Sequence, residues 1–391
     1  MMHYLLMGHR VPAVLLLIIA LVLLAAGPVD ADPFASSPGA RARAMAGAFT
    51  AVADDCSAVW YNPSGIAGEK AAATFGWSQA GAVRGVEGEL DADEQAWLVG
   101  AQFSGEDQEA EIAGGLKYGV GIYYLTPYTM HYWAHDPAGY DVAWGQVNEG
   151  MQIISLPLAL SSPEGRFKVG GTIEWVRTSV TCPEIFYRDP YNWAAPFSTD
   201  EASDTGFSGS LGALGVLVRN EKVGFELTLG GVYRLDGATD MGAELPSKNG
   251  GRAVADFFFD KPESVEIGLA ATQALPAKAR VILSGQYSTI DWGGGAAHTY
   301  DRLAAGAELT IEKEIAFITQ GAFRCGYYRS EPSGGERVWD WPEVSAITYG
   351  LGVLAGENIG MDLSFENRSL ENDGGLDDDV FLAGVAMTIL F

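Results

Sequence analysis

The chain has 391 residues, and its 50 acidic and 24 basic residues give a formal net charge of −26. So negative a chain disfavours nucleic acid and anionic lipid headgroups as general partners, and we expect many of its carboxylates in solvated outer loops. Only 19% of the residues are charged, and glycine and aromatic residues are abundant, which excludes a disordered chain and fits β-structure.

The first 31 residues predict a secretory signal peptide. Arg10 precedes an apolar run over 14–26, and a small-residue cleavage pattern ends at Ala31. The run is shorter than the roughly 20 residues that a spanning helix needs, so a retained N-terminal anchor is the less favoured alternative. We therefore expect residues 1–31 to be removed and the mature chain to begin at Asp32.

Beyond residue 31, no stretch of the sequence is both apolar enough and long enough for a transmembrane helix. A chain that enters a membrane without such helices does so as a closed β-barrel, because every backbone polar group needs a partner within the chain. A soluble β-sandwich or propeller is the alternative, although no repeat of about 40 residues is evident.

The remainder of the chain divides into segments in which apolar and polar residues alternate, a pattern typical of barrel strands with one face toward lipid. Short links alternate with long ones along the series, as periplasmic turns and outer loops do in outer-membrane barrels. This alternation favours a membrane barrel over a soluble sandwich. The predicted strands are 71–80, 94–104, 109–133, 148–161, 166–182, 206–219, 222–236, 263–275, 279–291, 301–312, 314–328, 344–356, 358–370 and 379–391.

The same alternation assigns faces to the strands. We expect Phe317, Phe323 and Tyr327 to face lipid, and Gln320 and Arg324 to face the lumen. Charges of both signs inside a barrel can pair across it, so their simplest role is structural. The polar residues predicted to face the lumen are Glu226, Arg234, Arg324, Glu366 and Arg368.

A segment built mainly from small residues, 39–67, precedes the first predicted strand. Alanine and glycine let backbone pack closely against backbone, which suits a confined space. Asp54 and Asp55 can cap a short helix, and Asn62 followed by Pro63 ends it, since the residue before proline is pushed out of the helical region. An N-terminal helix of a soluble domain is the alternative interpretation.

This segment resembles the N-terminal hatch of the FadL-type outer-membrane transporters of long-chain fatty acids and other hydrophobic compounds. The resemblance rests on Ala53-Asp54-Asp55 and on Asn62-Pro63-Ser64, in which Ser64 stands where the family usually has Ala. Further along, 119–127 is similar to the family's third-strand segment, and 261–269 followed by 286–292 is similar to its Pro-x-x-x-x-x-Gly…Tyr-x-x-x-(Asp)-Trp pattern. The resemblance therefore covers nearly the whole mature chain.

The resemblance implies an all-β fold, a 14-stranded antiparallel transmembrane β-barrel over residues 71–391 with a hatch over residues 32–70 inside its lumen. It also implies passive passage of hydrophobic molecules, with the hatch as a gate. We expect Asp54, Asp55 and Asn62 to bond to the inner wall, since unpaired polar groups in a plug are costly. PorV-like barrels share a similar Asn-Pro segment, so a scaffold or shuttle for protein secretion, or a purely structural barrel, is the alternative function.

The third predicted strand, 109–133, is rich in glycine and contains a proline, a combination that favours kinks and bulges. In the family, this strand bends inward beside the hatch and opens a lateral window for cargo. The resemblance therefore implies an exit at Gly119, Gly121 and Pro127, whereas ordinary barrel curvature is the simpler explanation of the glycines.

Two long predicted outer loops, 183–205 and 237–262, carry many apolar side chains. The resemblance implies a hydrophobic capture groove there, and an aromatic girdle at the membrane interface is the alternative. The residues concerned are Phe186, Tyr187, Tyr191, Trp193, Phe197, Met241, Leu245, Phe257, Phe258 and Phe259.

No motif of a catalytic, metal or cofactor site accompanies the strands, so we expect neither an enzyme nor a cofactor. A lipase or deacylase assembled across several strands is the exception that local motifs cannot detect. Cys56, Cys182 and Cys325 lack a Cys-x-x-Cys spacing and are interpreted as small apolar residues. The acidic loop 371–379 leaves calcium binding open, although it lacks the spacing of a defined calcium loop.

The chain ends in an alternating strand closed by Phe391, which resembles the C-terminal signal read by the outer-membrane assembly machinery. Together with the signal peptide, it predicts a location in the bacterial outer membrane. The expected partners are hydrophobic small molecules, outer-membrane lipids including lipopolysaccharide, and the periplasmic and outer-membrane assembly machinery. We expect a monomer.

Overall fold

The structure is a computed structural model of the chain. It describes residues 38–80, 93–106, 115–135, 143–187, 202–237, 242–246, 252–256, 261–292, 298–315, 317–334, 343–371 and 377–391.

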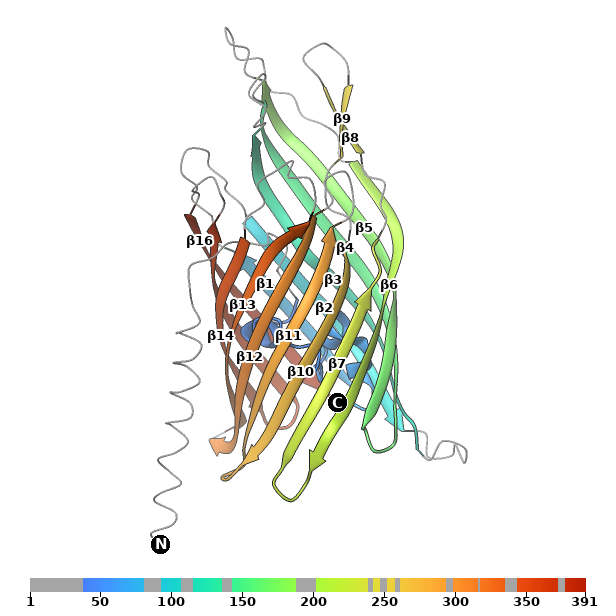
Figure 1. Cartoon of the computed structure of the whole chain (residues 1–391), viewed down its shortest axis with the longest axis vertical. Coiled ribbons are helices and arrows are strands. Elements are labelled where there is room, and N and C mark those ends of the chain that lie inside the picture. The colour runs from blue at the N-terminus through green and yellow to red at the C-terminus, as the bar shows by residue number, and fades with distance from the viewer. Residues whose placement is uncertain are drawn as a thin grey trace.

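Fourteen antiparallel strands close into a barrel in which each strand pairs with its neighbours along the chain, and the first strand pairs with the last (Figure 1). The predicted number of barrel strands is confirmed. The strands are β1 (Ala72–Ala80), β2 (Asp93–Glu106), β3 (Lys117–His135), β4 (Ala143–Ser161), β5 (Phe167–Tyr187), β6 (Ala202–Asn220), β7 (Phe225–Arg234), β10 (Glu263–Leu275), β11 (Ala279–Trp292), β12 (His298–Ile315), β13 (Ile318–Gly334), β14 (Glu343–Ala355), β15 (Ile359–Glu371) and β16 (Asp377–Leu390).

The strands β8 (Gly242–Pro246) and β9 (Arg252–Asp256) form a separate hairpin that is not part of the barrel wall. It lies at the top of Figure 1. The sequence predicted a loop here. Gly237 and Lys261, which flank the segment that contains this hairpin, pair with each other in an isolated β-bridge.

Tight turns join β4 to β5, β6 to β7, β10 to β11 and β14 to β15 at one end of the barrel, the lower end in Figure 1, and we call it the short-turn end. Gly165, Gly224 and Gly356 occupy these turns with φ of 67°, 65° and 60°, a region that glycine enters without strain. The end of the chain lies here too, since the Phe391 amide donates to the carbonyl of Ala71.

The alternation of the strands becomes an apolar outer surface and a more polar inner one. On β13 and just before it, Phe317 and Phe323 are 73% and 52% exposed, whereas Arg324 is buried in the interior. On β15, Leu363 is exposed while Glu366 and its neighbours on the inner face are buried. The predicted faces of these strands are confirmed.

Residues 38–70, which we call the hatch, lie inside the barrel, in blue in Figure 1. They form the short helices α3 (Ala40–Ala44) and α4 (Ala58–Tyr61) and the 3₁₀ helix η1 (Pro63–Ile66). Helix α3 packs against β13 to β16 and β1, and η1 packs against β3 to β6. In the described part of the chain, no helix has the length and apolar character needed to cross a membrane.

Candidate functional site

The hatch rests on a set of inward-facing glycines that we call the glycine collar. At seven of these glycines, an added Cβ would lie less than 3.0 Å from a hatch atom. At the eighth, Gly268, the distance would be 3.1 Å. Only glycine therefore lets the hatch backbone lie directly against the wall. The collar comprises one residue on each of eight strands, namely Gly119, Gly170, Gly212, Gly230, Gly268, Gly306, Gly326 and Gly350.

The Asn62-Pro63-Ser64 turn joins the hatch to β6. The buried Asn62 amide nitrogen donates to the carbonyls of Thr50 (2.9 Å) and Ala213 (3.0 Å), which lie in the hatch and the wall. The Asn62 side-chain oxygen accepts from the Ser64 hydroxyl at 2.7 Å, so the serine at the family's usual alanine position has a specific partner. Pro63 begins η1, as a residue without an N–H donor is suited to do.

Among the residues that the structure describes, Asp54 and Asp55 bond within the hatch and not to the inner wall, so this part of the prediction is wrong. Both carboxylates contact Arg41 within the hatch, at 2.5 Å and 3.1 Å. Asp55 also accepts from the amide of Ser57 at 2.8 Å, next to the start of α4. Arg41 is only 13 positions from Asp54 in the sequence, so the hatch itself supplies the cation that these carboxylates need.

Arg41 itself provides the link to the wall. It donates two hydrogen bonds to Glu308 on β12, at 2.7 Å and 3.1 Å. Glu308 is only 2% exposed and also binds Arg324 at 2.6 Å, while Arg324 binds Asp362 at 2.6 Å. Arg324 was predicted to face the lumen. Glu308 was missed, although it lies at an inward position of an alternating strand.

A second polar cluster holds the middle of the hatch. Arg234 on β7 bonds to the buried carboxylate of Glu266 and to the backbone carbonyl of Trp60. The Thr50 hydroxyl donates to Glu266 at 2.9 Å, and its amide donates to Gln286 at 3.0 Å. Hatch and wall thus satisfy one another's buried polar groups.

A third cluster lies against the first helix of the hatch. Glu366 accepts from the Tyr328 hydroxyl (2.7 Å) and from Arg368 (2.9 Å). The guanidinium of Arg302 lies 3.9 Å from the centre of the Tyr328 ring and donates to the carbonyl of Ala46 at 3.1 Å. Four predicted lumen residues therefore belong to networks that support the hatch, namely Arg234, Arg324, Glu366 and Arg368.

Strand β3 is irregular in two places. Between Thr126 and Thr129 it has one residue more than either neighbouring strand, so it forms a bulge around Pro127. Nearer its start, Gly121 lacks a pairing partner on β4, where Pro157 stands opposite and has no N–H to donate. Gly119 instead belongs to the collar, where it makes room for the carbonyl of Ile66. The lateral opening predicted at these residues stays a prediction.

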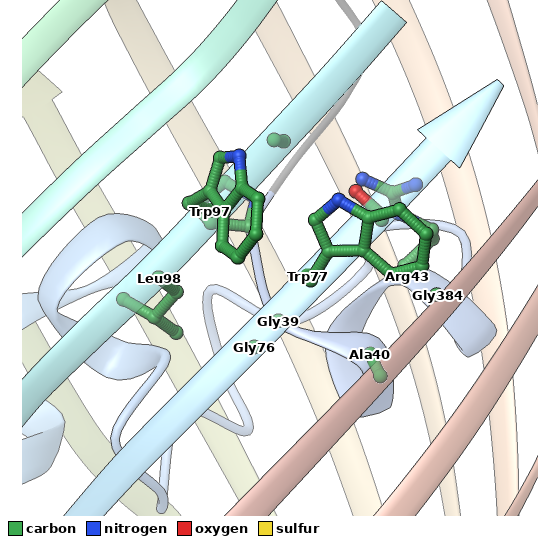
Figure 2. A pocket seen from close by; sticks show the side chains of 11 residues that line it. Gly39, Ala40, Arg43, Gly76, Trp77, Trp97, Leu98 and Gly384 are labelled. Carbon is green, nitrogen blue, oxygen red and sulfur yellow. The ribbon is translucent and has the colours of Figure 1, made fainter.

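The collar has no member on β15, β16, β1 and β2, which are four neighbouring strands of the barrel. A small cavity of about 10 Å³ lies here between the hatch and the wall, enough for about one water molecule. Figure 2 shows Gly39 and Ala40 of the hatch behind the strands and the Trp77 and Trp97 rings in front of them. The two rings lie 6.1 Å apart, so an aromatic cluster covers the outer face of this sector.

A larger cavity of about 400 Å³, which we call the vestibule, lies between the hatch and the short turns. The cavity is lined by hatch residues and by polar residues near the ends of the strands. One of these is Glu226, which pairs with Arg219 at 2.6 Å. On the hatch side, Glu69 pairs with Lys168 at 2.9 Å. Burial raises the pKa of Glu69, and the neighbouring Lys168 ammonium opposes that shift.

Most of the residues predicted to form a capture groove lie outside the described part of the chain. Tyr191, Trp193, Phe197, Met241 and Phe257 to Phe259 belong to this group. Leu245 lies on β8. Phe186 and Tyr187 were predicted in a loop, but they continue β5, where they pair with Trp144 and Ala143 on β4. The acidic loop falls largely in 372–376, which is also outside the described residues.

No family model and no curated protein matches the sequence. Solved structures do match the fold. The CymD monoaromatic hydrocarbon channel aligns with a TM-score of 0.61 at 13% identity, over 91% of this chain and 98% of that one. The toluene transporter TodX of Pseudomonas putida aligns with a TM-score of 0.56 at 14% identity, over 91% and 99%.

A FadL homologue of Pseudomonas aeruginosa aligns with a TM-score of 0.54 at 14% identity, over 93% of this chain and 98% of that one. The alignments cover nearly all of each barrel, so the similarity predicted from the sequence motifs is confirmed for the fold. This chain has the fold of the FadL-type barrels, a closed antiparallel barrel of fourteen strands.

Proposed function

We propose that this protein lets hydrophobic molecules cross the bacterial outer membrane by passive diffusion. The observation that carries the proposal is the fold, which is similar over nearly its whole length to a hydrocarbon channel and a toluene transporter. The apolar outer face of the strands supports a position within a membrane. Long-chain fatty acids or hydrocarbons are the proposed cargo.

The interior supports hydrophobic cargo rather than ions. The hatch lies against glycines on eight of the fourteen strands, and its polar groups are tied to the wall by three networks. A water-filled pore of the kind that conducts ions would need an open section here. In this proposal, the hatch is a gate, and Asp54, Asp55, Asn62, Pro63 and Ser64 shape it.

The bulge in β3 supports a lateral exit for the cargo. A bulge bends its strand and leaves a residue unpaired, which locally weakens the wall. A route from the lumen into the membrane at Gly121 and Pro127 would spare apolar cargo the polar vestibule. Capture at the outer loops, removal of residues 1–31, contact with lipopolysaccharide and a monomeric state complete the proposal.

A scaffold for protein secretion is the competing function, because it uses the barrel without passing small molecules through it. Uptake separates the two. We expect cells that make the protein to accumulate labelled toluene or oleate faster than cells that lack it. Equal rates for both labels, with the protein assembled in the outer membrane, would contradict transport and favour the scaffold.

A further inference from the structure

The vestibule has a local charge opposite to that of the whole chain. Among the residues that line it, five are basic and three are acidic, an excess of two positive charges in a protein whose net charge is −26. The basic residues are Lys117, Arg166, Lys168, Arg219 and Arg280, and the acidic ones are Asp54, Glu69 and Glu226.

Each of the three acidic groups already has a basic partner. Asp54 binds Arg41 of the hatch, Glu69 binds Lys168, and Glu226 binds Arg219. The excess positive charge therefore comes from the other basic side chains of the wall.

Two of these side chains are weakly held. Arg280 contacts Glu308 at 3.6 Å, longer than the 2.7 Å and 2.6 Å contacts that Glu308 makes with Arg41 and Arg324, and its side chain is 44% exposed. The Lys117 ammonium makes no hydrogen bond or ion pair with any side chain that the structure describes, and its methylene groups pack on Gly68. Neither cation has a close ion-pair partner among those side chains, so both can meet an anion in the cavity.

The remainder of the lining combines the hydroxyl side chains of Ser161, Thr228 and Thr272 with a group of apolar side chains. Val52 of the hatch and Leu214, Val216 and Ile282 of the wall belong to this apolar group. A volume of about 400 Å³ lies within the range of ~300–1,000 Å³ that small-molecule sites occupy. A ligand that satisfies both surfaces combines one anionic group with an apolar body.

We propose that the vestibule binds an organic monoanion, a carboxylate on an aliphatic or aromatic body, dissolved in the compartment that the short turns face. Arg280 and Lys117 hold the carboxylate, and the apolar wall residues contact the body. Arg280 also belongs to the network that ties the hatch to Glu308, so an anion bound there lies next to the hatch anchor. Binding at this site does not depend on whether cargo crosses the barrel.

Equilibrium binding to the purified full-length protein in lipid nanodiscs tests the proposal, with octanoate as the probe and octanol as its uncharged match. We expect the wild type to bind octanoate on the order of tenfold more tightly than octanol, because hydrogen bonds from a cation to a carboxylate are stronger than those to a neutral hydroxyl. Arg280→Gln and Lys117→Gln should each weaken octanoate binding by about tenfold and leave octanol binding unchanged.

Arg329→Gln is the matched control, because Arg329 is an exposed arginine at the other end of the barrel, paired with Glu331 and Glu343. It should bind octanoate like the wild type. Lys117→Gln removes no hydrogen bond or ion pair to a side chain that the structure describes, so it remains informative if Arg280→Gln fails to assemble. Equal affinities of the wild type for octanoate and octanol, or wild-type octanoate binding by Lys117→Gln, would overturn the proposal. Both results are measured by binding and not by uptake, so a failure of this proposal can be distinguished from a failure of the proposed transport function.

Discussion

Arg41 in the hatch and Glu308 on β12 form a two-pronged ion pair, with Nε to Oε2 at 2.7 Å and Nη2 to Oε1 at 3.1 Å. Glu308 is almost fully buried and also holds Arg324, so its carboxylate joins the plug to the wall. Removing one partner of a buried pair leaves uncompensated charge, which typically costs ~3–5 kcal/mol.

We therefore expect Glu308→Gln to loosen the hatch while the barrel still assembles. In detergent, trypsin should cleave after Arg41 and Arg43 much faster than in the wild type, and mass spectrometry identifies the new end. Glu343→Gln is the control, since its pair with Arg329 is exposed and contributes at most ~1 kcal/mol. Equal cleavage rates in wild type and Glu308→Gln would contradict an anchoring role.

The glycine collar makes a separate prediction. A valine at Gly230 would place its Cβ against the backbone of Thr50, and overpacking of this kind costs ~1–3 kcal/mol or more. We expect Gly230→Val to displace the hatch and raise the ionic conductance of the protein in planar bilayers.

Gly215→Val is the matched control, because nothing lies within 4 Å of a Cβ at Gly215 on the neighbouring strand. Its conductance should equal that of the wild type. If Gly230→Val conducts no better than Gly215→Val, either the hatch accommodates the valine or it does not block the lumen.

The barrel was predictable from the sequence because each strand has one face toward lipid and one toward the lumen, so alternation alone marks both its position and its register. Phe317 and Arg324 illustrate this, and the structure confirms both faces. The hairpin of β8 and β9 carries no such constraint, since it stands apart from the barrel. The sequence for that reason predicted a loop.

The anchors of the hatch could be predicted only in part. Arg41 and Glu308 are 267 positions apart, and no local pattern links them. The wall contact of Asn62 followed from its burial in a plug, but Asp54 and Asp55 were assigned to the wall although Arg41 lies nearer. The glycine collar could not be predicted from the sequence for a similar reason. An inward glycine is required only where the hatch lies against it, and that contact joins residues far apart in the sequence.

Cys56 reports on the opening of the hatch. Burial, with a smaller contribution from the Asp55 carboxylate, raises the pKa of the Cys56 thiol to about 12. Since the thiolate is the reactive form, the closed protein should resist alkylation at pH 8. In a Cys182→Ser, Cys325→Ser background, we expect iodoacetamide to label Cys56 only after denaturation. Rapid labelling of the folded protein would mean that the hatch opens readily without cargo.

The bulge in β3 allows the lateral exit to be tested without disturbing the hatch. Replacing Gly119 would press a side chain against Ile66 of the hatch, so that variant confounds two effects. Deleting Pro127 is cleaner, since it removes the one residue that β3 has in excess of both neighbours and lets β3 pair with β2 and β4 without a bulge at this point. If cargo leaves the lumen here, uptake should fall to the level of cells without the protein.

A matched deletion controls for the loss of a residue from a strand. Leu217 on β6 occupies another single-residue bulge, between Val216 and Val218 in the pairing with β7, and its side chain is exposed on the outer face. The variant without Leu217 should transport toluene like the wild type. Both deletions should keep the heat-modifiable gel mobility of an assembled barrel. Normal toluene uptake by the assembled Pro127 deletion would contradict a lateral exit at β3 and would move the exit to the short-turn end, where cargo would have to pass the vestibule.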